Sequence, residues 1–192
     1  MRAMVIFAHP VPDSFSAALH ATVLSSLSKR GWDIDNCDLY AEGFNPVMSP
    51  DERRIYHDYP QNTHTVQPHV DRLRAAQALV LVFPVWVYGF PAILKGFFDR
   101  VCVPGVAFRL ENGLVRPNLQ NIRKLAAVTT YGGSRLRALF SGDPPRRIVS
   151  RSIRFYCRGA KLEYLALYDM NRATDIRRKQ FLKHVTARMA VL

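Results

Sequence analysis

The chain has 192 residues, and its 48% hydrophobic and 22% charged residues predict one globular domain over residues 1–192, with no apolar run long enough to span a membrane. The three cysteines, Cys37, Cys102 and Cys157, are widely spaced and form no CxxC pair, which argues against a disulfide framework or a cysteine zinc site and favours a reducing cytoplasm. Lys and Arg number 27 against 15 Asp and Glu, and this net charge of +12 predicts an anionic partner, whether a nucleotide cofactor, a nucleic acid or an acidic membrane surface.

The first expected element is a strand over residues 4–8, because a continuous apolar run is typical of a parallel strand that is covered on both faces. Residues 1–8 lack the longer apolar region and the cleavage site of a signal peptide. A helix follows, since large apolar residues recur every four positions, at Phe15, Leu19, Val23 and Leu27. Asp13 or Ser14 is expected to cap this helix, which ends near Gly31.

The middle of the chain continues the alternation of strands and helices. A weaker strand is expected over residues 33–39, and a polar stretch rich in Pro and His follows over residues 44–67. A short helix over residues 70–76 leads to a buried strand over residues 78–83. The later elements are an aromatic loop, a helix opened by Pro91 with apolar positions up to Val101, and a hairpin over residues 105–117 that turns at Asn112 and Gly113.

Two more strands are expected over residues 124–130 and 161–168, each followed by a helix, and Asn171 is the expected cap of the last helix. One helical face is basic, with arginines at steps of four, three and four: Arg147, Arg151, Arg154 and Arg158. The opposite side of this helix carries Val149, Ile153 and Tyr156. A solvated surface is the more common explanation of such a face, and peripheral docking on an acidic surface is the alternative.

Five strands that alternate with helices predict a doubly wound parallel sheet with right-handed crossovers. Ligands of such sheets bind outside the carboxyl ends of the strands, at the point where the strand order reverses. A ligand site is therefore expected at three loops, HPVPDSFS after the first strand, PVWVYGFP after the third and TYGGS after the fourth.

The first loop contains neither GxGxxG nor GxxxxGKS, so hydroxyl groups must replace a glycine-rich phosphate cradle. Ser14 and Ser16 stand where a helix begins, and the free N–H groups and positive dipole end of a helix favour a phosphate there. His9 ends the preceding strand and could donate a hydrogen bond to a phosphate oxygen. Taken singly, Ser14 could be only a cap, Phe15 only a core residue and His9 only structural.

The second loop suits a flat, electron-poor ring, because its backbone can bind the polar edge of the ring while Trp86 and Tyr88 pack against it. Gly89 and Pro91 would fix this loop and start the next helix. In the third loop, Gly132 and Gly133 let the backbone approach a ligand closely. The alternatives are that the two aromatic residues belong to the core or to an interface, and that the glycines form a plain turn.

Four segments, in this order and at this spacing, carry a resemblance to a known family: AHPVPDSFSAAL, DLYAEGFNPVMS, FPVWVYGFPAILKGFFDRV and TTYGGS. They resemble the NAD(P)H:quinone oxidoreductase family of flavodoxin-like flavoproteins, whose members include DT-diaphorase and the bacterial modulator of drug activity. The resemblance covers most of residues 4–134, and the stretch PAILKGFFDRV with the preceding FP is its most specific part.

The resemblance implies a flavodoxin-like fold, with five parallel strands in the order 2-1-3-4-5 and helices on both faces. It also implies a homodimer with non-covalent FAD at the subunit interface. FMN is the alternative cofactor, and residues 51–67 are expected to decide between the two by covering or failing to cover the adenine. The implied chemistry is ping-pong: NAD(P)H reduces the flavin by hydride transfer, and a quinone-like acceptor then takes two electrons, with no catalytic acid or base assigned.

Carried over position by position, the resemblance assigns cofactor-binding roles to residues of all three loops. The pyrophosphate region falls to His9, Ser14, Phe15 and Ser16, the ring system to Pro84, Val85, Trp86, Val87 and Tyr88, and the ribityl chain and pyrimidine edge to Thr130, Tyr131, Gly132 and Gly133.

The chain departs from this family directly after the double glycine. Better-known members carry a Tyr and then a His near the pyrimidine edge of the flavin, whereas this chain reads SRLRALFSGDPP and has neither. Reduced flavin gains negative charge at that edge, so a positive group there would stabilise it. We hypothesise that Arg135 or Arg137 supplies this group.

Two other functional classes stay open at this point. One is a flavin-binding ancillary subunit, for example of a potassium-efflux system, which would use its arginines to dock on an acidic surface. The absence of the Tyr and the His is the feature that distinguishes this class from the enzyme. DNA binding through the arginine face lacks a recognised module, so no nucleic acid partner is expected. His57, His64 and His69 share one polar segment, but their spacing fits no zinc pattern, so no metal site is predicted.

Overall fold

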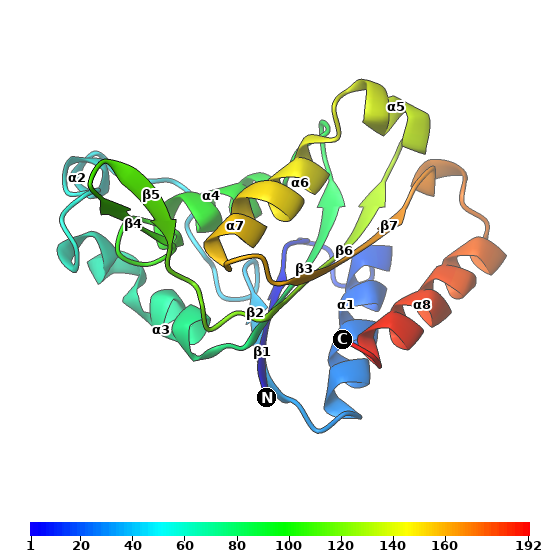
Figure 1. The fold of residues 1–192 in the computed structure, drawn as a ribbon. Coiled ribbons are helices and arrows are strands. Elements are labelled where there is room, and N and C mark those ends of the chain that lie inside the picture. The colour runs from blue at the N-terminus through cyan, green and yellow to red at the C-terminus, as the bar shows by residue number, and fades with distance from the viewer.

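The computed structural model describes all residues 1–192 and contains a five-stranded sheet in the order β2-β1-β3-β6-β7 (Figure 1). All neighbouring pairs in this sheet are parallel. The strands are β1 (Arg2–Phe7), β2 (Asp33–Asp38), β3 (Ala78–Val85), β6 (Lys124–Tyr131) and β7 (Lys161–Leu167). This topology confirms the predicted fold and the predicted strand order.

Helices cover both faces of the sheet (Figure 1). The longer helices are α1 (Phe15–Ser28), α3 (Gln67–Ala75), α4 (Ala92–Val101) and α8 (Asp175–Met189). The shorter ones are α2 (Pro50–Arg54), η1 (Gln61–Val66), α5 (Arg135–Phe140), α6 (Pro144–Arg147), η2 (Ile148–Ile153), α7 (Arg154–Tyr156) and η3 (Met170–Arg172). None of the helices combines the length and the apolar composition that crossing a bilayer requires.

Successive side chains of the central strands enter two different cores, as the two-residue period of a strand requires. Val5 of β1 packs in the core beneath α1 and α8, together with Val23 and Val185. Its neighbour Ile6 packs in the core beneath α3 and α4, together with Leu73 and Phe97. Burial on both faces explains why β1 and β3 read as unbroken apolar runs.

A small antiparallel hairpin, β4 (Phe108–Glu111) with β5 (Leu114–Pro117), lies outside the main sheet. Asn112 and Gly113 form its turn, and both have positive φ angles, 51° and 76°. Two-residue hairpin loops favour this pair of conformations, and Asn-Gly adopts it at low cost. The hairpin and its turn were predicted, and the structure confirms them.

Two expectations about helices need correction. Asn171 does not cap the last helix, because the side chain of Thr174 accepts the hydrogen bond from the Arg177 N–H instead. The basic segment is not one regular α-helix, since a π-helical stretch, η2, separates α6 from α7. Its burial pattern nevertheless holds, with Val149 and Ile153 in the core. The four arginines of the predicted face form no ion pair.

Candidate ligand-binding cleft

The loops after β1, β3 and β6 meet at the carboxyl end of the sheet and enclose two adjoining cavities of about 230 and 290 Å³. The smaller cavity is lined by His9, Ser14, Phe15, Ser16, Pro84, Val85, Trp86, Thr130, Gly132, Met170 and Asn171. The larger is lined by Val85, Val87, Tyr88, Tyr131, Gly132, Gly133, Ser134, Arg137 and Asn171. The two cavities share Val85, Gly132 and Asn171, so they form one continuous cleft. Every residue that the sequence suggested for cofactor binding borders this cleft.

The start of α1 offers hydrogen-bond donors to the smaller cavity. The Ser14 hydroxyl caps the helix by accepting a bond from the Ala17 N–H at 3.1 Å. The N–H groups of Phe15 and Ser16 have no acceptor within the chain, and the nearly buried Ser16 hydroxyl has no partner either. Unsatisfied donors at the positive end of a helix dipole form a site for an anion such as a phosphate.

His9 lies beside this helix start with its imidazole oriented by the backbone. Its Nδ1 lies 3.1 Å from the Val11 nitrogen and 3.3 Å from the Val11 carbonyl oxygen, so the backbone of Val11 fixes this side of the ring. The imidazole centre is 5.8 Å from that of the Trp86 indole. His9 and the indole therefore border the same space.

The aromatic loop is a two-residue hairpin turn. Gly89 donates to the Trp86 carbonyl at 2.8 Å, and Trp86 donates back to the Gly89 carbonyl at 3.2 Å. The central residues, Val87 and Tyr88, both have positive φ angles, 49° and 54°. Gly and Asn normally occupy such positions, and a β-branched valine there is strained. Backbone strain of this kind is concentrated at ligand-binding sites, and the sequence pattern did not reveal it.

The side chains of this turn point outward into the cleft region and solvent. Trp86 is 41% exposed, and Val87 is fully exposed at the tip. The indole is thus not part of the sheet core, and it borders the same cavity as Ser14 and Ser16. This placement provides the apolar surface that a flat ring needs.

In the third loop, Tyr131 can contact a ligand through its backbone but not through its side chain. Its side chain is 2% exposed, and its hydroxyl donates to Oδ1 of Asp143 at 2.6 Å and contacts the Tyr164 hydroxyl at 2.7 Å. Burial, reinforced by the neighbouring Tyr164 and Asp143, raises the pKa of Tyr131 far above its usual range. The neutral phenol therefore anchors this end of β6 to the segment after α5.

The two glycines of this loop keep the cleft open. A methyl group on Gly132 would lie 3.2 Å from Nδ2 of Asn171, and one on Gly133 would lie 3.7 Å from the Tyr88 hydroxyl. A side chain at residue 132 would therefore displace its neighbour and occupy ligand space.

Asn171 is a cleft residue that the sequence reasoning missed, because we had expected it to be only a helix cap. It borders both cavities, and its amide makes no hydrogen bond within the chain. Of the two arginines that were suggested for the pyrimidine edge, Arg137 lines the larger cavity and Arg135 does not. Arg137 is therefore the one in position to act on a ligand.

Residues 51–67, which were expected to decide adenine binding, do not border the cleft. Glu52 pairs with Arg100 of α4, and the Asn62 side-chain amide donates to the Pro104 carbonyl at 3.0 Å. These contacts hold the segment against α4 and the loop that follows it.

The chain belongs to the Flavodoxin_2 family, whose members have a flavodoxin-like fold, since the model of that family matches residues 1–189. The chain is 30% identical to NAD(P)H dehydrogenase [quinone] 1 of Rattus norvegicus over 154 residues, which are 72% of this chain and 56% of the rat protein. It thus spans about half the length of the curated relatives that it matches.

Solved structures share this fold over the whole chain. Smu.1420 from Streptococcus mutans UA159 is 28% identical with a TM-score of 0.88, and the match covers 100% of both chains. The NAD(P)H:quinone oxidoreductase from Methanothermobacter marburgensis is 25% identical with a TM-score of 0.79, and the match covers 99% of this chain and 98% of that one. The relatives that the chain resembles include flavodoxin-like NAD(P)H oxidoreductases.

Proposed function

We propose that the protein is a flavin-dependent NAD(P)H oxidoreductase that reduces quinones or related acceptors by two electrons. The observation that carries this proposal is the convergence of an anion-binding helix start, an aromatic hairpin turn and a double glycine on one cleft. The family membership and the relatives named for quinone reduction support the same reading.

The residues of the cleft fit a flavin. The free N–H groups at the start of α1, with the Ser16 hydroxyl and His9, would hold its phosphate. Trp86 and Tyr88 would pack on or beside the ring, and Gly132 leaves the space that a side chain would fill. The chemistry that a bound flavin supplies is hydride transfer from NAD(P)H to an acceptor in two half-reactions.

The contribution of the chain is to bind, orient and stabilise charge. Arg137 lines the cavity beside Tyr88 and Gly133, where the pyrimidine edge would lie. A guanidinium group at this position would favour the negative charge that develops at that edge on reduction. We assign this role to Arg137 in place of the Tyr and His that better-known members carry.

We expected FAD as the cofactor, with FMN as the alternative. The position of residues 51–67 favours FMN, because this segment is bound to α4 and the loop that follows it and does not line the cleft. The mass of the cofactor that heat releases from the purified protein distinguishes the two.

We also propose a homodimer in which the partner covers the mouth of the cleft. Large apolar side chains are exposed beside it, with Val87 at 100%, Phe140 at 89% and Leu136 at 66%. Figure 1 shows α5, which carries two of them, at the same end of the sheet as the tip of β3. An exposed apolar patch of this kind marks an interaction site. Light scattering should give twice the chain mass, and Phe140→Ser with Leu136→Ser should shift it toward the monomer.

A flavin-binding ancillary subunit with little turnover is the second candidate. The observation that favours it is a set of three exposed arginines that form no ion pair and line a shallow cavity with Phe155: Arg151 on η2, Arg154 on α7 and Arg158 after α7. Such a surface suits docking on an acidic partner.

One experiment separates the two candidates. The purified yellow protein is mixed with NADH or NADPH without oxygen, and menadione is then added. An enzyme loses its flavin colour with the nucleotide and recovers it with menadione. If neither nucleotide bleaches the protein, the ancillary function is the correct one.

A further inference from the structure

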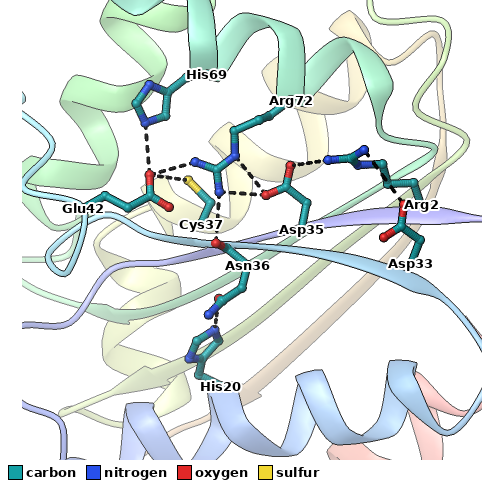
Figure 2. A network of polar contacts seen from close by, with 9 residues as sticks. All are labelled: Arg2, His20, Asp33, Asp35, Asn36, Cys37, Glu42, His69 and Arg72. Atoms are coloured by element: carbon teal, nitrogen blue, oxygen red, sulfur yellow. Dashed lines mark hydrogen bonds and ion pairs between the residues drawn. The ribbon is translucent and has the colours of Figure 1, made fainter.

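A cluster of polar and sulfur ligands lies away from the cleft, between β2 and α3 (Figure 2). It contains the thiol of Cys37 on β2, the carboxylate of Glu42 in the following turn and the imidazole of His69 on α3. His69 Nε2 is 3.3 Å and Cys37 Sγ is 3.9 Å from the same oxygen, Oε2 of Glu42. The three potential ligand atoms all lie within 4.8 Å of one another.

These spacings match those of metal ligands. Around a tetrahedral zinc ion, bond lengths of about 2.0 Å to nitrogen and oxygen and about 2.3 Å to sulfur place neighbouring ligand atoms about 3.3 to 3.5 Å apart. The imidazole and carboxylate are already at this separation, and the thiol requires only a small approach. A fourth position would remain for water.

The surroundings hold the ligands in place. Cys37 is fully buried in β2, so packing restricts the position of its sulfur. The His69 ring packs edge-on against Phe44 and Phe97, with ring centres 5.0 and 5.8 Å apart. Side chains that are locked by packing form a preorganised site.

Arg72 would compete with a metal ion for the Glu42 carboxylate, because it donates to Oε2 of Glu42 at 2.7 Å. It is also bound to Asp35, and the second oxygen of Glu42, Oε1, has no partner. A rotation of the carboxylate can therefore place one oxygen on a metal ion while Arg72 keeps the other or stays with Asp35.

The proposed ligands would carry the charge that a dication needs. A divalent ion bound by the Cys37 thiolate, the Glu42 carboxylate and a neutral His69 imidazole forms a centre without net charge. Such compensation lowers the cost of burying the charges. The neighbouring Arg72 and Arg2 are bound to Asp35 (Figure 2).

We propose that Cys37, Glu42 and His69 bind a transition-metal ion of the zinc class. A thiolate, an imidazole and one carboxylate suit Zn²⁺ or Co²⁺, whereas Mg²⁺ and Ca²⁺ prefer oxygen alone. The ion would join the end of β2 to α3, two elements that the chain separates by the whole 44–67 segment.

The test is a titration of the full, reduced chain with Co²⁺, followed by the visible and thiolate charge-transfer absorbance, and then by competition with Zn²⁺. We expect one ion per chain. Loss of a residue that hydrogen-bonds to a metal ligand typically weakens metal binding 10–100-fold. Cys37 would itself be a ligand, so Cys37→Ser should weaken Co²⁺ binding by at least about 100-fold. His69→Gln should weaken it too, and it keeps the proposal testable if the buried Cys37→Ser variant does not fold.

Cys157→Ser and His64→Gln are the matched controls, because Cys157 is another buried cysteine and His64 belongs to the same histidine-rich segment. Both should bind Co²⁺ like the wild type. The absence of equimolar binding, or a thiolate band that survives in Cys37→Ser, would overturn the proposal. Because the readout does not involve flavin, the result is independent of the proposed oxidoreductase function.

Discussion

A methyl group added to Gly132 would lie 3.2 Å from Nδ2 of Asn171, which is tighter than an ordinary van der Waals contact, so the absence of a side chain at residue 132 leaves room for this amide. The Asn171 amide makes no hydrogen bond in the chain, and both residues border the two cavities of the cleft. Gly132 and Asn171 therefore face the same part of the proposed flavin site.

Gly132→Ala should therefore weaken flavin binding. The added methyl group would crowd the Asn171 amide where both residues border the cleft, and we expect a loss of about tenfold in affinity, or about 1.4 kcal/mol. Asn171 is on the surface and can move, so the melting temperature of the flavin-free protein should hardly change. Flavin fluorescence titration measures the affinity. An unchanged affinity would show that the ligand lies elsewhere.

Val87→Asn should stabilise the flavin-free protein. Asparagine tolerates the left-handed backbone of residue 87 better than valine, and relief of the strain is worth about 1 kcal/mol, which for a chain of this size is roughly 2–4 °C in melting temperature. Val47→Asn is the control, because Val47 is also exposed but has an ordinary backbone conformation. Equal effects of the two substitutions would contradict the strain assignment.

Arg137→Ala should lower the midpoint potential of the bound flavin. Loss of a cation worth about 1.4 kcal/mol to the reduced form corresponds to roughly 30 mV for a two-electron couple. Arg135→Ala should leave the potential unchanged, because Arg135 belongs to the same helix but does not line the cavity. An identical potential in wild type and both variants would remove Arg137 from the account.

Stability should fall at acid pH through Glu52. Burial alone would raise the pKa of Glu52, but hydrogen bonds from Ser49, Thr65 and Arg100 outweigh it and lower the pKa from 4.5 to about 2. Above pH 4.5 the carboxylate is charged in both folded and unfolded chains, and its stabilisation is complete. As the pH falls from 4.5 toward 2, the unfolded chain takes up the proton first, and about 3 kcal/mol of stability is lost.

Urea unfolding of wild type and Glu52→Gln over this pH range checks the assignment. The variant should be less stable at neutral pH and should show a flatter dependence between pH 4.5 and 2. Parallel curves for the two proteins would mean that the Arg100 pair does not set this part of the acid response.

The sheet and the position of the cleft could be predicted because their signals are local. Unbroken apolar runs mark buried strands such as β1 and β3, and the carboxyl-end rule then brings their loops together. The amino-acid sequence does not indicate the left-handed backbone of Val87, since a β-branched residue normally argues against this conformation. That strain is imposed by the pairing of Trp86 with Gly89.

The missed features depend on contacts between distant segments. Asn171 reaches the cleft because η3 lies beside Gly132. The buried hydroxyl of Tyr131 donates to Asp143 and contacts the hydroxyl of Tyr164, both from later segments of the chain. The spacing of the histidines along the chain matches no zinc pattern, and it could not reveal the proposed metal site because the proposed partners of His69 come from β2 and the turn after it. Tertiary contacts of this kind leave no periodic signal in a single sequence.

The central claim is that the three loops form a flavin-binding cleft, and titration of the flavin-free protein with FMN, repeated with FAD, tests it most directly. We expect one flavin per chain, tighter binding of FMN than of FAD, and clear weakening in Ser16→Ala and Trp86→Ala. If neither flavin binds, or if both variants bind as well as the wild type, the cleft is not a flavin site.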